Sequence, residues 1–470
     1  VLIKVKTKNM GKKLKIAGGH YNTVDTAHNI LKLGGNAFDA AVAGVFSSMS
    51  CEYLYTGAAS GGAMLVKKNG LSPQIIDFFV ETPAINPAKV GDFKTIHADF
   101  GDTKQEFNIG VGSVGIPGTL PGLIQIHKNY GSLPFSVLVE QAVDLAKNGC
   151  SISPNQEYLS EVLSPVISNS KTLKSIFTKK GSLLKSGDSF FNKDFGSFLE
   201  QFLYEDANKF YKHEVCPLFY NALKEGGIIS LKDLQEYTPK KRAPLKMRYR
   251  NHNIFMNPLP STGGRLINGG LGELRELSRV SRKDIEGALY KIKTIKEKDM
   301  VGSTTHISII DKENNVASVT TTNGVGAGFI IPGTGIMPNN MLGEKHLNPY
   351  GFHSWKSKQR IPSNICPTLI VGNNQNLITL GSAGSSRIVS ATISVITNLI
   401  NNGMSLKEAV SKPRIHLEGS TLHCEPHIRR PEYQTKNVVL WEEKSMYFGG
   451  VNACSLSDSV ADERRSGVSV

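Results

Sequence analysis

Residues 303–322 read STTHISIIDKENNVASVTTT, and this stretch decides the fold. It contains two β-like runs, 304–311 and 316–322, on either side of the turn-forming letters DKENN. Apolar runs rich in β-branched residues that flank a polar turn predict a β-hairpin. We therefore expect two adjacent antiparallel strands here, with Thr304 at the start of the first.

Thr304 stands where a polar, lysine-rich segment, 286–303, meets the first predicted strand. We expect that segment to be mobile or exposed. A threonine hydroxyl is a poor nucleophile without a base beside it, and cutting the chain directly before a threonine supplies one, the freed α-amine. That amine titrates at about 7.7–8.0 in reference peptides, close to working pH. From the hairpin alone, the simpler interpretation is that Thr304 and Thr305 are β-branched residues that start a strand.

The remaining sequence predicts alternating helices and strands without a domain boundary. A length of 470 residues suggests about three domains as a soft prior. No linker rich in proline or serine divides the chain, however. The predicted elements are helices at 23–35, 36–50, 135–149 and 388–401, a largely helical region at 151–237, and strands at 61–70 and 368–372.

The net charge of +14 comes from short segments of the chain. Residues 4–15 and 240–250 each hold six basic residues and no acid, and 291–299 adds a net +2. A surface that binds nucleic acid usually interleaves aromatic side chains with the basic ones. Segment 240–250 has one aromatic, Tyr249, and alternates like a strand with one solvated face. We therefore expect no nucleic-acid partner, and the charge alone keeps a basic nucleic-acid-binding protein as a third hypothesis.

Targeting signals are absent from the sequence as written. No run of 18 or more apolar residues occurs, so we expect no membrane-spanning helix and no membrane partner. The first 13 residues are basic but lack the apolar core of a secretory signal. This predicts a cytoplasmic protein, or a periplasmic or secreted one if a leader was removed before residue 1.

Cofactor motifs are weak or missing. Six cysteines without a CxxC pair predict buried free thiols rather than a disulfide scaffold or a zinc site. Residues 110–115, GVGSVG, match the GxGxxG pattern, but Pro117 interrupts the helix that a dinucleotide site requires. There is no P-loop, HExxH or GxSxG motif. We expect no metal and no other cofactor.

Taken with its neighbours, the hairpin resembles the γ-glutamyltranspeptidases, which are N-terminal-nucleophile hydrolases. The resemblance rests on many short segments that occur in the family's order over nearly the whole chain. They are GGNAFDAA (34–41), GGAML (61–65), VGIPGT (114–119), YGSLP (130–134), GGIISLKDL (226–234), PLPSTGG (258–264), TTH (304–306), DKENN (311–315), GFIIPGTGIMPNN (328–340), CPT (366–368), GSAGSSR (381–387) and PRIH (413–416).

The resemblance implies an α+β fold, the four-layer αββα sandwich of N-terminal-nucleophile hydrolases. It also implies one precursor that cuts itself between Ser303 and Thr304. Residues 1–303 then form the large subunit and 304–470 the small subunit, joined without a disulfide as a heterodimer of the chain's own two fragments and together making one domain.

The resemblance further assigns roles in catalysis. Thr304 matches the nucleophile that attacks a γ-glutamyl amide and forms an acyl-enzyme. Thr322 matches the second threonine, which orients the nucleophile. Gly384 and Ser385 match a Gly-Gly pair whose backbone N–H groups form the oxyanion hole, and a serine keeps the backbone donor if its φ is allowed.

The implied substrate contacts differ from the family pattern at several positions. Ser363 and Asn364 match two serines that hold the substrate α-carboxylate, and an asparagine can still donate hydrogen bonds there. Glu344 matches an aspartate that pairs with the α-ammonium group. Asn323 lies one residue before the place of a substrate-binding asparagine, which Gly324 occupies.

The largest departure is Phe79, which stands where the family has an arginine that clamps the α-carboxylate. A phenylalanine cannot replace that charge-assisted contact. The leading hypothesis remains a self-processing enzyme that transfers the γ-glutamyl group of glutathione and related amides to water or to an amino-acid acceptor. The alternative is an amidase or acylase with the same mechanism and another acyl specificity, which Phe79 and Gly324 motivate.

Overall fold

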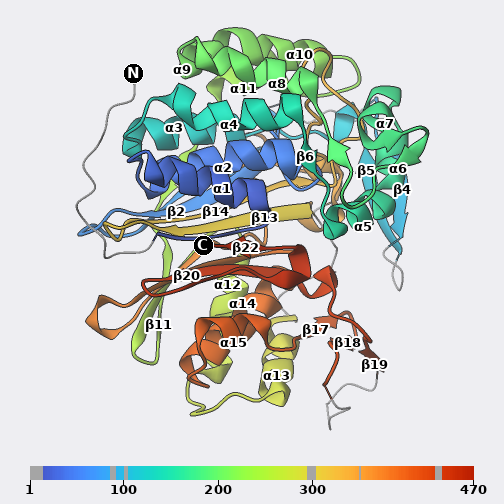
Figure 1. Ribbon diagram of the computed structural model, residues 1–470. Coiled ribbons are helices and arrows are strands. Elements are labelled where there is room, and N and C mark those ends of the chain that lie inside the picture. Colours follow the sequence, from blue (N-terminus) through green and yellow to red (C-terminus); the bar gives the residue numbers. More distant parts are fainter. Residues whose placement is uncertain (1–13, 85–90, 100–103, 294–302, 349–350, 429–436) are drawn as a thin grey trace.

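A computed structural model of the chain describes residues 14–84, 91–99, 104–293, 303–348, 351–428 and 437–470. Two β-sheets stack face to face and helices cover the outer face of each, so that the layers run helix, sheet, sheet, helix (Figure 1). This confirms the predicted α+β class. Within the described ranges, no helix has the combination of length and apolar character that crossing a membrane requires.

The predicted hairpin is confirmed and lies near the middle of a seven-stranded antiparallel sheet. Its strands pair from Ile310 and Val316 back to Ser303 and Gly324, with a register shift just after Ser303. Every residue of both strands is buried, because helices pack on one face and the second sheet on the other. In spatial order the strands are β10 (Lys240–Arg242), β3 (Gln74–Phe78), β2 (Gly61–Lys67), β14 (Val316–Gly324), β13 (Ser303–Ile310), β1 (Lys15–Gly18) and β22 (Val468–Ser469).

The second sheet has six strands and is also antiparallel. Its order is β11 (Leu245–Tyr249), β12 (His252–Met256), β15 (Thr368–Val371), β16 (Leu377–Ala383), β20 (Gly450–Ser455) and β21 (Ser459–Val460). Lys246 and Arg248 are exposed on edge strand β11, whereas Met247 and Tyr249 are buried, which confirms the predicted alternation. The basic segment 240–250 is thus divided between the edge strands of two sheets.

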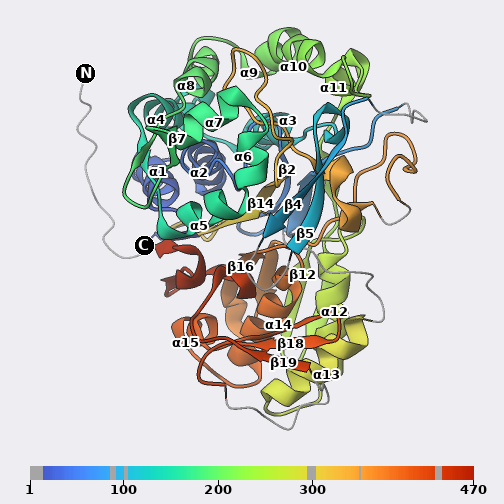
Figure 2. The same cartoon turned by 90° about the vertical axis from the view of Figure 1, so that its right-hand side faces the viewer.

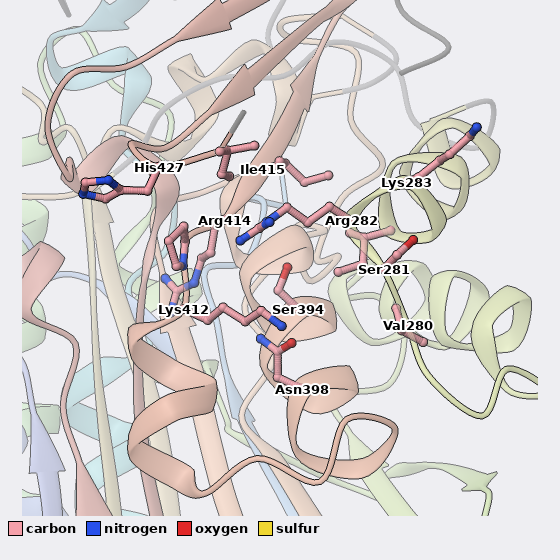
Figure 3. A pocket seen from close by; sticks show the side chains of 13 residues that line it. Val280, Ser281, Arg282, Lys283, Ser394, Asn398, Lys412, Arg414, Ile415 and His427 are labelled. Carbon is pink, nitrogen blue, oxygen red and sulfur yellow. The ribbon is translucent and has the colours of Figure 1, made fainter. Parts of the chain in front are cut away.

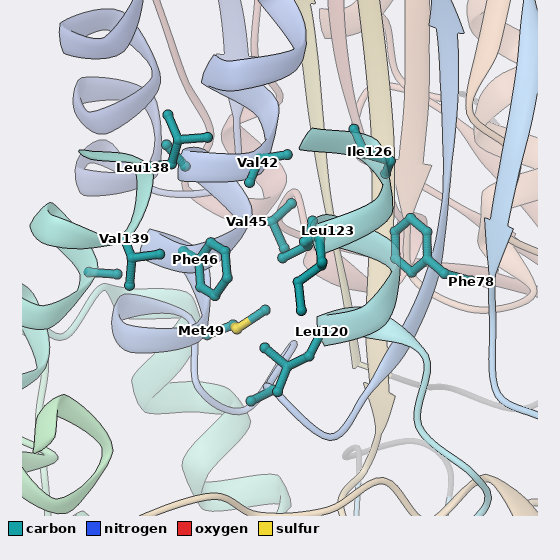
Figure 4. Close-up of a cluster of buried hydrophobic side chains, with 14 of the residues drawn as sticks. Val42, Val45, Phe46, Met49, Phe78, Leu120, Leu123, Ile126, Leu138 and Val139 are labelled. Carbon is teal, nitrogen blue, oxygen red and sulfur yellow. The ribbon is translucent and has the colours of Figure 1, made fainter. Parts of the chain in front are cut away.

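Helices α1 (Tyr21–Lys32), α2 (Ala37–Cys51) and α3 (Thr119–Tyr130) cover the outer face of the first sheet, and α4 (Phe135–Asn148) packs on α2. A capping box between Asn36 and Asp39 starts α2, which is buried along its whole length. Figure 4 shows Val45 and Met49 of α2 against the leucine side chains of α3. Because α2 also contacts β13 and β14, this packing holds the hairpin against the helical layer.

Helices α12 (Gly263–Leu274), α13 (Arg282–Lys293), α14 (Arg387–Ile400) and α15 (Leu406–Ser411) cover the second sheet. The expectation of a mobile or exposed segment at 286–303 is wrong for residues 286–293, which belong to α13. Ala288, Leu289 and Ile292 are buried there, because helical spacing places them on one face beneath the lysines. Residues 294–302 lie outside the described residues, as do residues 1–13.

The region 151–237 is mainly helical, as predicted, and short strands interrupt it. Figure 2 shows its first helices beside β4 and β5. The two strands that precede the region are β4 (Lys94–Asp99) and β5 (Lys104–Ile109). The helices and short strands that follow are β6 (Cys150–Ser151), α5 (Pro154–Val162), α6 (Ser164–Ser168), α7 (Lys171–Phe177), β7 (Thr178–Lys179), β8 (Ser182–Leu183), β9 (Ser189–Phe190), α8 (Lys193–Glu200), α9 (Ala207–Phe210), α10 (Cys216–Leu223) and α11 (Leu231–Glu236). A three-stranded sheet, β17 (Ile415–Glu418), β18 (Thr421–Cys424) and β19 (Asn437–Leu440), completes the structure.

Candidate active site

A small cavity at the start of β13 brings most of the predicted site residues together. Its volume is about 30 Å³, enough for roughly one water molecule. Ser303 precedes it on the same strand and is buried. The residues that line it include Thr304, Thr322, Glu344, Ser363, Asn364 and Ser385, together with Phe79, Gly324, His346 and the apolar side chains Met341, Leu347, Ile365 and Ile388.

Thr322 lies at the end of β14 and holds the carbonyl that precedes Thr304. Its hydroxyl donates a hydrogen bond to the Ser303 carbonyl oxygen and accepts one from the Gly324 amide at 3.2 Å. In this uncut chain, Thr322 therefore polarises the carbonyl of the peptide bond that is expected to break. The register shift between Ser303 and Thr305 sets this bond apart from the regular ladder.

The turn between β16 and α14 holds Gly384 and Ser385, the two residues predicted to form the oxyanion hole. Gly384 has φ +118° and Ser385 has φ +53°, and the left-handed conformation of Ser385 is one that a serine rarely adopts. The Ser385 Oγ is buried and has no hydrogen-bond partner in the described part of the chain. Because α14 begins at Arg387, its positive N-terminal dipole end lies beside the cavity that Ser385 and Ile388 line.

Glu344 is a buried acid in this cavity, with only 2 % of its surface exposed. Burial raises the pKa of its carboxyl group to about 8, which a hydrogen bond from the Val325 amide partly opposes. One carboxyl oxygen lies 3.6 Å from His346 Nε2, and the other has no hydrogen-bond partner among the described residues. Glu344 is thus available to a ligand and is neutral over much of the physiological range.

Gly324 explains why no asparagine stands at its position. It has φ +69°, and a Cβ built on it would lie 2.3 Å from both Asn340 Oδ1 and Glu344 Oε1. Asn323 does not replace the missing side chain, because it does not line the cavity. Its amide instead donates to the carbonyl oxygen of Met337 at 3.1 Å.

Ser363 and Asn364 are held by the neighbouring segment that leads into α12. The Ser363 hydroxyl donates to Ser261 Oγ at 3.3 Å, and Asn364 Oδ1 accepts from Thr262 Oγ1 at 3.0 Å. Accepting that bond leaves the Asn364 amide nitrogen as its donor group. Both side chains line the same wall of the cavity.

Phe79 lines the cavity and is 3 % exposed. The guanidinium of Arg360, which contacts the Phe79 backbone, is already engaged: it donates to the Phe79 carbonyl at 2.6 Å and lies 3.5 Å from both Asp77 and Glu81. It also stacks on Tyr237 at 4.5 Å. Among the described residues that line the cavity, none is an arginine or a lysine.

The sequence model of one family, Gamma-glutamyltranspeptidase, matches residues 23–288 and 272–468. The chain belongs to the γ-glutamyltranspeptidase family. It is similar to the "Glutathione hydrolase proenzyme" of Escherichia coli (strain K12), with 25% identity over 456 residues that cover 83% of this chain and 78% of that protein. It is also similar to the "Acylase ACY 1 proenzyme" of Pseudomonas sp. (strain SE83), with 26% identity over 515 residues covering 94% and 91%.

Solved structures show the same architecture. A cephalosporin acylase from Bacillus halodurans superimposes with a TM-score of 0.79 over 100% of this chain and 98% of its own, at 19% identity, a likeness of fold. A γ-glutamyltranspeptidase from Helicobacter pylori, 28% identical, gives a TM-score of 0.52 over 62% of this chain and 83% of its own. The fold is therefore that of the γ-glutamyltranspeptidase and cephalosporin acylase structures.

The sequence analysis missed a polar network behind the candidate nucleophile of this family member. Glu52, at the end of α2, accepts hydrogen bonds from Thr305 Oγ1 and Thr23 Oγ1, both at 2.7 Å. Thr304, Thr305 and Glu52 line a second small polar cavity together with Gln156 and Arg465. No local motif reveals this network, because its members come from distant parts of the chain.

His306 lines the same polar cavity, and its buried ring is held by neighbouring hydroxyl groups. Burial lowers the pKa of its imidazole to about 3, so the ring is neutral. Its two nitrogens lie 2.7 Å from Thr320 Oγ1 and 3.0 Å from Ser308 Oγ. Gly381 gives the ring its space, because a Cβ there would lie 2.2 Å from it.

Proposed function

We propose that this member of the γ-glutamyltranspeptidase family is a self-processing amide hydrolase or acyltransferase whose nucleophile is Thr304. The observation that carries the proposal is the hydrogen bond from Thr322 to the Ser303 carbonyl, directly beside Thr304 in a buried cavity. Its relatives include proteins described as glutathione hydrolase and acylase proenzymes, which supports synthesis as a precursor.

This geometry supports self-cleavage by the following steps. The Thr304 hydroxyl attacks the Ser303 carbonyl carbon, whose oxygen Thr322 polarises. The C–N bond then breaks, an ester forms between Ser303 and Thr304 Oγ, and the α-amine of Thr304 becomes free. Water hydrolyses the ester and returns the hydroxyl, leaving residues 1–303 and 304–470 as separate chains.

The topology supports a stable pair of fragments after the cut. The first sheet joins β1, β2, β3 and β10 to β13, β14 and β22, and the second joins β11 and β12 to the later strands. Each proposed subunit therefore supplies strands to both sheets of an N-terminal-nucleophile-type αββα sandwich. All six cysteines are buried and free, so the heterodimer is held by non-covalent packing.

In the proposed reaction, the freed α-amine of Thr304 takes the hydroxyl proton as the oxygen attacks the substrate amide. The backbone N–H groups of Gly384 and Ser385, at the positive end of α14, stabilise the oxyanion. The amine then protonates the leaving group. Water or an amino-acid amine releases the acyl group from Thr304, and no step requires a cofactor or a metal.

The acyl group that the cavity suits best lacks an α-carboxylate. Phe79 presents an aromatic ring where a clamp would need a cation, and Arg360 is already engaged by Asp77 and Glu81. The γ-glutamyl group of glutathione is the second candidate. An α-ammonium group bound beside Glu344 would favour the ionised form of its carboxyl group, and Ser363 and Asn364 still offer hydrogen bonds.

A matched set of p-nitroanilides separates the two candidates: γ-glutamyl, 4-aminobutyryl without the carboxylate, glutaryl without the ammonium, and butyryl with neither. We expect kcat/KM for 4-aminobutyryl to lie within about threefold of that for γ-glutamyl, because no charged clamp is lost. A preference for γ-glutamyl of about a hundredfold or more would establish the second candidate.

Phe79→Arg and Phe79→Leu form the matched pair of variants for this test. The arginine variant should gain a preference for acyl groups that carry the carboxylate, whereas the leucine variant should not. Activity on none of the four anilides by cleaved protein would reject this account of acyl specificity while leaving self-processing to be judged by its own measurement.

A further inference from the structure

A third and larger cavity opens among the helices that cover the second sheet, away from Thr304. Its volume is about 560 Å³, within the range of pockets that hold small molecules. Val280 and the start of α13 form one side, Ser394 and Asn398 of α14 another, and the segment from Lys412 to Ile415 a third (Figure 3). It shares no lining residue with the candidate active site.

The lining of this cavity is basic. Arg282, Lys283, Lys412 and Arg414 line it, and none of its described lining residues is an aspartate or a glutamate. Arg414 is paired with Asp462 at 2.6 Å. No ion pair joins Arg282 or Lys412 to an acid within the described part of the chain.

Two cationic side chains converge on buried hydrogen-bonding groups. Figure 3 shows Arg282 and Lys412 reaching into the pocket toward Ser394, whereas Lys283 points away. Ser394 is 4 % exposed, and its hydroxyl has no hydrogen-bond partner among the described residues; the same holds for Arg282 Nε. Buried polar groups are nearly always hydrogen-bonded. The Ser394 hydroxyl and Arg282 Nε are therefore donors that a ligand could satisfy.

An anion is the acceptor that these groups favour. Burial lowers the pKa of Lys412, and the nearby charge of Arg282 lowers it further. Asp284, the acid in the first turn of α13, is not such an acceptor, because its carboxylate already accepts a hydrogen bond from the Ser281 hydroxyl at 2.6 Å. Two neighbouring cations without a counter-ion are stabilised by an anion that accepts from both.

We infer that this cavity is a binding site for a small organic anion that carries a phosphate or carboxylate group. The anionic group lies between Arg282, Lys412 and the Ser394 hydroxyl. The rest of the ligand packs against Val280 and Ile428, which are buried apolar residues of the same lining. This site is independent of the proposed function of Thr304.

Calorimetric titration with pyrophosphate and with citrate, in separate arms, tests the site on the full chain. We expect saturable binding of at least one of them, with one site per chain. Binding in the pyrophosphate arm alone identifies a phosphate-bearing ligand, and binding in the citrate arm alone a carboxylate-bearing one. Absence of saturable binding in both arms overturns the inference.

Three variants locate the bound anion. Arg282→Gln and Lys412→Gln should each weaken binding by at least about tenfold, because each removes a charge-assisted contact. Lys407→Gln removes an exposed charge on α15, outside the lining of the cavity, and should leave the affinity unchanged. Equal weakening by all three would show general surface attraction and contradict a built site. The variants should keep the thermal midpoint of the parent, because neither Arg282 nor Lys412 has an ion pair to lose within the described residues.

Discussion

The carboxyl group of Glu344 occupies the space that a side chain at Gly324 would need. A Cβ on Gly324 would lie 2.3 Å from Glu344 Oε1, well inside van der Waals contact. The family pattern combines a shorter acid, aspartate, with an asparagine at these two positions. We therefore propose that the longer acid and the missing side chain are one linked change in this chain.

Exchanging both residues tests this link. Gly324→Asn alone should lower the free energy of unfolding by about 1–3 kcal/mol, because it overpacks a buried wall. Asparagine tolerates the positive φ of this position, so steric overlap with Asn340 Oδ1 and Glu344 Oε1, which are equally close, is the main cost. Adding Glu344→Asp removes only the second overlap and should recover part of the loss in a double-mutant cycle by chemical denaturation. Simple additivity of the two changes would contradict the coupling.

Thr322 should control the rate of self-cleavage. Removing its hydroxyl in Thr322→Val takes away the donor to the Ser303 carbonyl and should slow cleavage by about 10²–10³-fold, as expected for one oxyanion-type donor. Thr322→Ser keeps the hydroxyl and should cut at a rate within about tenfold of the parent. Gel time courses of freshly made protein measure both rates. Valine and parent chains that cut equally fast would rule out this role.

Glu344 should make stability depend on pH. Its pKa is about 8 in the folded chain, whereas an unfolded glutamate titrates at about 4.3. Between these values the folded state binds more protons, so the free energy of unfolding falls as pH rises, by about 1.4 kcal/mol per unit. Glu344→Gln stays neutral and should lack this loss.

Denaturation in a Thr304→Ala background, which keeps parent and variant uncut, measures this effect. The advantage of Glu344→Gln over Glu344 should grow between about pH 5 and about pH 8. An advantage that stays constant over this range would show that the Glu344 pKa is not raised.

Ser385 separates backbone from side-chain contributions at the oxyanion loop. Ser385→Gly relieves a left-handed serine and should stabilise the chain by up to about 1 kcal/mol, whereas Ser385→Ala keeps the strain. Both retain the backbone N–H, so both should keep kcat within about tenfold on the preferred anilide. A loss of about a hundredfold in both variants would assign the oxyanion contact to the hydroxyl instead.

Local pattern predicted the parts of this fold that short-range sequence determines. The strands around the DKENN turn, the buried helix α2 and the long helix α14 all follow from apolar spacing and turn residues within one window. The lysines near the end of α13 suggest an exposed segment, although the helical spacing of Ala288, Leu289 and Ile292 forms a buried apolar face.

The candidate site could be predicted only in part. Thr304 and Ser385 lie in the quoted motifs, and they meet Thr322 and Ser363 in one cavity. The contact of Glu52 with Thr305 joins positions 253 residues apart, which no window reveals. Asn323 has the side-chain type expected of a substrate-binding residue, but its register on β14 turns the amide toward Met337.

Identification of the N-termini in purified protein by mass spectrometry tests the central claim most directly. We predict two fragments, one of which begins at Thr304. Thr304→Ala should remain a single chain that is inactive on every anilide. An active parent protein without a new N-terminus at Thr304, or a Thr304→Ala variant that is still cut there, would contradict it.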